Sequence, residues 1–60
     1  MKVGDYIVIQ QGVHDERIPK DRRDGLVLEI AGKKKDQMFI LFSNGEILKF
    51  HITQIQNLSL

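Results

Sequence analysis

The pair Asn44-Gly45, flanked on both sides by apolar runs, constrains this chain more than any other feature of its sequence. Asn-Gly between strand-like runs is the strongest local signal for a β-hairpin, because both residues tolerate the positive φ angles of a type I′ turn. The sequence therefore predicts a hairpin over residues 37–50 with a two-residue loop. Such a loop pairs Ser43 with Glu46 and thereby fixes the register of the whole hairpin.

This predicted register gives the hairpin two different faces. One face is uniformly apolar and is expected to lie in the core. It consists of Phe39, Leu41, Leu48 and Phe50. The opposite face reaches water at one end, yet it carries more large apolar side chains than an exposed face usually shows. We interpret these side chains as a candidate protein interface, with the alternative that strong curvature brings some of them inside. They are Met38, Ile40, Phe42 and Ile47.

Other apolar runs predict the remaining strands. Residues 6–9 alternate so that Ile7 and Ile9 face inward. Residues 25–31 form a second strand, with Glu29 outward unless a β-bulge shifts the alternation midway. Residues 32–36 suit a hairpin loop, residues 52–55 a 3₁₀ turn, and residues 57–60 a short final strand.

Residues 10–24 are predicted to form one long loop with eight charged side chains, four of each sign. Pro19 lacks a backbone donor, and Gly12 permits a sharp bend, so the segment is a poor strand. Its length indicates a functional or a mobile loop. Val13 and Ile18 are expected to pin it to the rest of the domain.

Five short strands, one long loop and a 3₁₀ turn before the last strand predict one all-β domain over residues 1–60. Closure into a small barrel would remove the exposed edge strands. Sixty residues without a cysteine lie near the lower limit for a domain that folds without a disulfide or metal. Self-association would supply additional burial.

The composition narrows the classes of function. Nine basic and eight acidic side chains give a formal charge of +1, so there is no overall field to steer a polyanion. No apolar run approaches the roughly 20 residues that span a bilayer, and Asp5 interrupts any signal-peptide core. We therefore expect no membrane partner and a cytoplasmic location.

The sequence contains no catalytic motif and no ligand spacing typical of a metal site. The histidines and nearby acids that were considered as ligands fit ordinary surface positions better. They are His14, Asp15, Glu16 and His51. We expect no enzymatic activity, no cofactor, no metal and no small-molecule substrate.

Basic residues in two loops define a second candidate site. Arg22 and Arg23 lie in the long loop, and Lys33, Lys34 and Lys35 lie in the turn over residues 32–36. If both loops lie at one end of the domain, these cations form a patch that contacts phosphates. The alternative is that they are solvated loops, largely neutralised by neighbouring acids.

Four segments carry a resemblance to known families: VGDYIVI at 3–9, GLVLEI at 25–30, ILFSNGE at 40–46 and ITQI at 52–55. Their order resembles SH3-like barrels of the Tudor, KOW and CarD types, and this implies a five-stranded SH3-like barrel. The opening KVGD and the ending around NGE are similar to small uncharacterised proteins of bacteriophages and marine metagenomes. That similarity implies a location in a host cytoplasm or a virion.

A further similarity involves GLV at 25–27, ILF at 40–42 and the F-x-I-x-x-I ending at 50–55. It is to the SH3-like subunits of photosynthetic complexes that dock ferredoxin. We expect a non-enzymatic protein-interaction or assembly module, covered by a protein partner or by a second copy. The alternatives are a nucleic-acid-binding accessory domain that uses the basic loops, or a docking domain for an acidic electron carrier.

Overall fold

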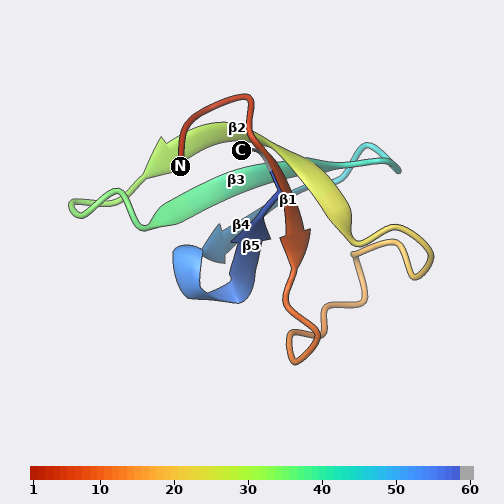
Figure 1. The fold of residues 1–60 in the computed structure, drawn as a ribbon. Helices are drawn as coiled ribbons and strands as arrows, with labels where there is room; N and C mark the ends of the chain where they lie inside the picture. The colour runs from red at the N-terminus through yellow and green to blue at the C-terminus, as the bar shows by residue number, and fades with distance from the viewer. Residues whose placement is uncertain (59–60) are drawn as a thin grey trace.

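The computed structural model describes residues 1–58 and shows a single curved antiparallel sheet in the order β4-β3-β2-β1-β5 (Figure 1). Its strands are β1 (Tyr6–Ile9), β2 (Asp24–Ala31), β3 (Gln37–Phe42), β4 (Ile47–His51) and β5 (Ile55–Asn57). A 3₁₀ helix, η1 (Ile52–Gln54), precedes β5. The all-β prediction is confirmed, with its five strands and its 3₁₀ turn. Ser59 and Leu60, which were expected to belong to the final strand, lie outside the described residues.

The sheet is open. β4 and β5 are its two edges, and they do not pair with each other within residues 1–58. The three residues of η1 join these edges directly, so the sheet bends until they approach each other at that end. A closed barrel is therefore not confirmed.

The hairpin between β3 and β4 differs from the predicted one by a single residue. Gly45 N–H donates to Phe42 O at 3.0 Å, and Phe42 N–H donates to Glu46 O at 2.9 Å. Gly45 has a φ of 86°, whereas Asn44 does not take a positive φ. The loop is thus a type I turn followed by a left-handed glycine, with three residues instead of two.

Because side chains alternate along a strand, this extra loop residue exchanges the inner and outer positions on β3, while those on β4 stay as predicted. The observed register pairs Ile40 with Leu48 and Met38 with Phe50. Leu48 and Phe50 are buried as predicted. Three of the four predicted interface side chains are also in the core, where each is at most 2% exposed; they are Met38, Ile40 and Phe42. The interface prediction is wrong for these three, and only Ile47 faces solvent.

The inner face of β2 allows the neighbouring strand to approach closely. A Cβ on Gly25 would lie 2.4 Å from Ile40 Cγ2 and 2.9 Å from Leu41 O, so β3 can pack here only against a glycine. Further along β2, the register with β3 shifts between Val27 and Glu29. This confirms the bulged alternative, in which Leu28 is the extra residue and is exposed.

The long loop is packed onto the core at one buried point. Ile18 is 4% exposed, and Val13 packs partly buried against the same cluster, which confirms the predicted anchors. Arg23 Nη2 donates to Gln10 O at 2.9 Å and to Val13 O. Arg23 therefore ties the two ends of the loop together by hydrogen bonds to its backbone.

Candidate functional site

A line of apolar side chains crosses four strands on the face opposite the core. The register pairs Tyr6 with Leu26, Leu26 with Leu41, and Leu41 with Ile47. Directly paired residues lie on the same face of a sheet, so these four form one row, which we call the outer stripe. Tyr6 is 57% exposed and Ile47 is 53% exposed; the two leucines are partly buried. The outer stripe is thus an apolar surface open to solvent.

A second row beside the outer stripe carries opposite charges at its two ends. Phe39 pairs with Glu29 on β2 and with Lys49 on β4. Phe39 is half-buried, and both charged side chains are exposed. Neither Glu29 nor Lys49 makes an ion pair within the described part of the chain. The row thus carries a negative side chain on β2, an aromatic one on β3 and a positive one on β4.

The sequence reasoning missed most of this face. It placed Leu41 and Phe39 in the core and included only Ile47 of the outer stripe. Asn-Gly occurs in two-residue loops, but a glycine after a type I turn is equally characteristic of three-residue loops. The missing signal was the length of the loop, because it decides which alternate residues face outward.

A hollow of about 230 Å³ adjoins one end of the outer stripe. Tyr6, Leu26 and Leu41 line it together with Arg22 and Asp24. The Arg22 guanidinium donates to both Asp24 carboxylate oxygens, with Nη2 at 3.1 Å from Oδ2. These hydrogen bonds lower the pKa of the Asp24 carboxyl and raise the pKa of the Arg22 guanidinium. Arg22 is therefore already neutralised by a neighbouring carboxylate.

The basic residues predicted to form one phosphate-contacting patch lie at opposite ends of β2. Arg22 and Arg23 precede the strand, and the lysine turn, Lys33–Lys35, follows it. Eight strand residues separate these ends by about 20 Å. Figure 1 shows the green turn over residues 32–36 and the yellow end of the long loop on opposite sides of the sheet. The prediction that these five residues form a single patch is therefore wrong, because the lysine turn is separated from Arg22 and Arg23.

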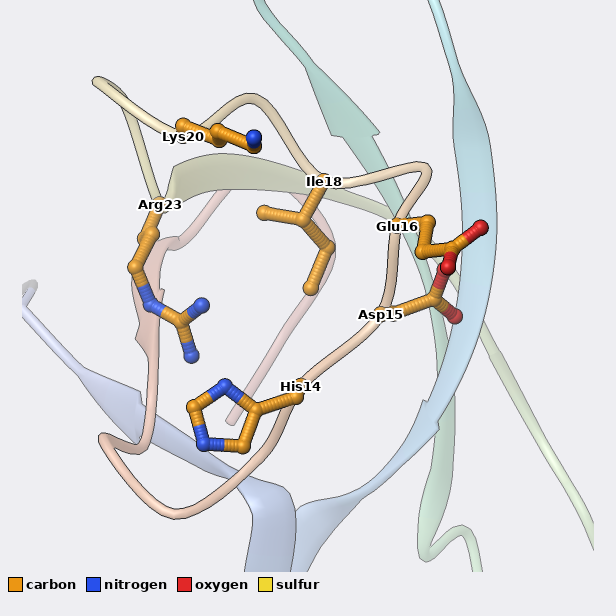
Figure 2. Close-up of a pocket in the computed structure, with 6 residues that line it drawn as sticks. All are labelled: His14, Asp15, Glu16, Ile18, Lys20 and Arg23. Carbon is orange, nitrogen blue, oxygen red and sulfur yellow. The ribbon is translucent and has the colours of Figure 1, made fainter.

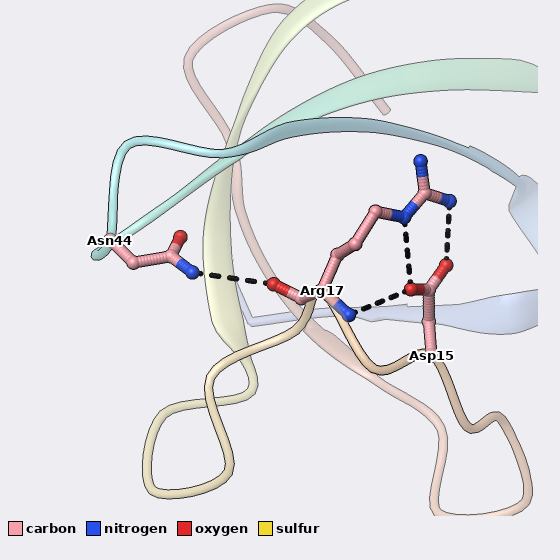
Figure 3. Close-up of polar contacts among 3 residues, drawn as sticks. All are labelled: Asp15, Arg17 and Asn44. Atoms are coloured by element: carbon pink, nitrogen blue, oxygen red, sulfur yellow. Dashed lines mark hydrogen bonds and ion pairs between the residues drawn. The ribbon is translucent and has the colours of Figure 1, made fainter.

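The long loop is joined to the β3–β4 turn by a polar clamp (Figure 3). The Asp15 carboxylate accepts from Arg17 Nε at 3.0 Å, from Arg17 Nη2 at 2.8 Å and from the Arg17 amide at 2.9 Å. Asn44 Nδ2 donates to Arg17 O at 3.3 Å. The side-chain hydrogen bonds from Arg17 lower the pKa of the Asp15 carboxyl from 3.8 to about 2. Asp15 is thus held as a carboxylate and is neutralised by Arg17.

A hollow of about 420 Å³ lies within the long loop (Figure 2). Its lining consists of His14, Asp15, Glu16, Ile18, Lys20 and Arg23. Three of these six side chains carry nitrogen donors, and Ile18 supplies an apolar wall. The chemistry of this lining suits a ligand with both a polar and an apolar part.

The two histidines are separated, and His51 has a local structural role. His51 Nδ1 accepts from the Thr53 amide at 3.2 Å and caps η1, while its Nε2 lies 3.1 Å from Asp36 Oδ2. Within residues 1–58 no group of three or more His, Cys, Asp or Glu side chains is arranged to hold a metal ion. His51 therefore contributes to the cap and not to the loop hollow.

The comparisons with known proteins give no indication of function, so a proposal must start from the geometry described above. Among residues 1–58, no helix has both the length and the apolar character needed to cross a membrane. No family model matches the chain, and no match was found among the curated proteins or the solved structures.

Proposed function

We propose that this chain is a non-enzymatic assembly module with an SH3-like fold, and that its outer stripe binds another protein surface. The observation that carries the proposal is the register of Tyr6, Leu26, Leu41 and Ile47 across four strands. Single exposed apolar side chains are common on protein surfaces, but a contiguous row indicates an interaction site.

The SH3-like assignment is supported by the order of the strands. β1 pairs with both β2 and β5, β2 to β4 follow one another as a meander, and a 3₁₀ turn separates the last two strands. This is the order that the resemblance at residues 3–9, 25–30, 40–46 and 52–55 implies. Access to the stripe is supported by the exposure of Tyr6 and Ile47, each more than half exposed within residues 1–58.

We assign the partner as a second copy of the chain, on the basis of charge complementarity. In this dimer the outer faces of two copies pack against each other around a twofold axis that runs parallel to β3 and passes over Phe39. Glu29 of each copy would then lie opposite Lys49 of the other copy. The same axis sets Ile47 of one copy against Leu26 of the other, apolar on apolar. A face that is self-complementary in this way is what an isologous dimer requires.

A dimer interface of standard size would cover only a limited share of the surface of this chain. A standard interface buries about 800 Å² per partner, roughly a fifth of the 4364 Å² accessible surface of the chain. Burying the outer stripe would add apolar contacts to a domain of only 60 residues, which has little core of its own.

Sedimentation equilibrium tests the proposal with a matched pair of variants. Ile47→Asp places a charge in the outer stripe, and Val3→Asp places the same charge at an equally exposed apolar residue outside the strands. We expect a dimer for the parent and for Val3→Asp, and a monomer for Ile47→Asp. A parent that is monomeric at high protein concentration, or equal behaviour of the two variants, would overturn the proposal.

A charge exchange tests the orientation of the two copies. Glu29→Lys and Lys49→Glu each place like charges opposite one another, and each should weaken the dimer about tenfold. The double variant restores opposite charges and should regain most of the parental affinity. If the double variant is as weak as the single ones, the twofold arrangement is wrong even if a dimer forms.

The lysine turn supports a second candidate function, the binding of a polyanion such as a nucleic acid. Lys33, Lys34 and Lys35 are exposed and make no ion pair within residues 1–58. Neutral replacement of all three should abolish DNA or RNA binding, which should otherwise weaken steeply with salt. Equal binding by the parent and the triple variant would exclude this function, as would no binding by the parent at low salt. The same experiment with an acidic electron carrier tests the docking alternative.

A further inference from the structure

The hollow within the long loop has the nitrogen-bearing side chains of His14 and Arg23 on one side. Figure 2 shows the His14 imidazole and the Arg23 guanidinium turned toward each other, with Ile18 between their two segments. The carboxylates of Asp15 and Glu16 point away from this space. A ligand in the hollow would therefore meet nitrogen donors before it met either carboxylate.

The ion pairs of the loop leave more unpaired cations than unpaired carboxylates in the lining of this hollow. Arg17 is paired with Asp15 at 2.8 Å, and Arg22 is paired with Asp24 at 3.1 Å. The other two cations of the loop, Lys20 and Arg23, form no ion pair within the described residues. Both of them line the hollow. Asp15 in the wall is neutralised by Arg17, so the unpaired charges of the lining within residues 1–58 are the two cations Lys20 and Arg23 and the single carboxylate of Glu16.

Arg23 is also held in position before any ligand arrives. Its Nη2 donates to the carbonyl oxygens of Gln10 and Val13. A guanidinium has five N–H donors, so these two bonds leave donors for a ligand. An arginine fixed by backbone carbonyls loses little side-chain freedom when it binds an oxyanion.

We propose that this hollow binds a phosphate group, with Arg23 and Lys20 as its cationic contacts and His14 as a further hydrogen-bond partner. A phosphate dianion has the charge to match two cations, and its oxygens accept several hydrogen bonds at once. The volume of about 420 Å³ exceeds that of a phosphate alone. The rest of a phosphorylated small molecule would pack against Ile18.

Titration with inorganic phosphate, followed by amide NMR at constant ionic strength with chloride as the balancing anion, tests the proposal. Lys20→Gln removes one contact and spares Arg23, which the loop needs for its own hydrogen bonds. Lys2→Gln is the matched control, because it removes the same charge at an exposed residue that does not line the hollow. Spectra without phosphate establish that both variants are folded.

We expect saturable shifts at residues 13–18 and 20–23, with affinity reduced about three- to tenfold in Lys20→Gln and unchanged in Lys2→Gln. Lys20→Arg, which keeps the charge, should bind as the parent does. Shifts that do not saturate, or equal weakening in both Gln variants, would overturn the proposal. Acetate binding as tight as phosphate would also overturn it, because the site would then select a carboxylate. The Ile47→Asp variant should bind phosphate normally, which separates this site from the outer stripe.

Discussion

The two faces of the sheet carry similar side chains but differ in their exposure to solvent. The inner face holds Ile40 and Leu48, and the outer face holds Leu41 and Ile47, which are their neighbours on the side of the turn. Ile40 is fully buried, whereas Ile47 is about half exposed. The two pairs have nearly the same hydrophobicity, so residue type does not assign them to a face. The register of the strands assigns each pair to its face, and this register depends on the turn between β3 and β4.

The largest expected difference between the faces is the stability cost of truncating a side chain. Ile40→Ala leaves a cavity in the core and should lower the free energy of unfolding by about 2–5 kcal/mol. Ile47→Ala removes contacts only from the exposed face of the monomer and should cost less than about 1 kcal/mol. Urea denaturation under conditions in which both variants are monomeric measures the two values. Equal costs would contradict the assignment of inner and outer faces.

A smaller effect is expected where the inner face has no room for a side chain. Gly25→Ala would place a Cβ against Ile40 Cγ2 and Leu41 O, and overpacking of this kind costs about 1–3 kcal/mol. Gly12→Ala is the matched control, since nothing lies within 4 Å of the added Cβ. Thermal unfolding should show a clear loss for the first variant and almost none for the second. A neutral Gly25→Ala would mean that β2 and β3 are further apart than described.

The turn that assigns the faces should be sensitive at one of its three residues. Gly45→Ala forces a side chain into a φ of 86° and should cost about 1 kcal/mol. Ser43→Ala is the control, because Ser43 does not take a positive φ. Denaturation midpoints compare the two variants. If Ala were tolerated equally at both positions, the left-handed glycine would not be what defines the loop.

The smallest effect is expected in the long loop, away from both faces. Asp15 has a pKa of about 2 in the folded chain, below its usual 3.8. Its contribution to stability is therefore fully present above pH 3.8 and is lost as the pH falls toward 2. Asp15→Asn should flatten the acid limb of the stability profile, whereas Asp21→Asn should not, because Asp21 is exposed and forms no ion pair within residues 1–58. Identical acid limbs in the parent and Asp15→Asn would show that the ion pair with Arg17 is not maintained in solution.

Much of the fold follows from local sequence patterns. The alternation around Ile7 and Ile9, the apolar anchor Ile18 and the 3₁₀ turn were all predictable, because each depends on neighbours along the chain. The bulge near Glu29 was left open as an alternative and is present. Local patterns therefore predicted the elements and their order.

The candidate site was less predictable, because it depends on features that local patterns leave open. Asn44-Gly45 is compatible with two loop lengths, and the wrong length reversed the positions of Met38, Ile40 and Phe42. The cations at Arg22 and Lys33 were grouped by charge, but an eight-residue strand separates them. Which arginines are neutralised depends on side-chain geometry that the sequence does not specify.

The three-residue turn also determines which genetic changes this fold tolerates. Substitutions at Ser43 or Asn44 leave every strand residue on its present face. Deletion of a single codon there would leave Phe42 opposite Glu46 with only two residues between them, and a two-residue loop requires a type I′ or II′ turn in place of the type I turn followed by a left-handed glycine. Variants of this chain should therefore differ in the identity of the turn residues far more readily than in their number.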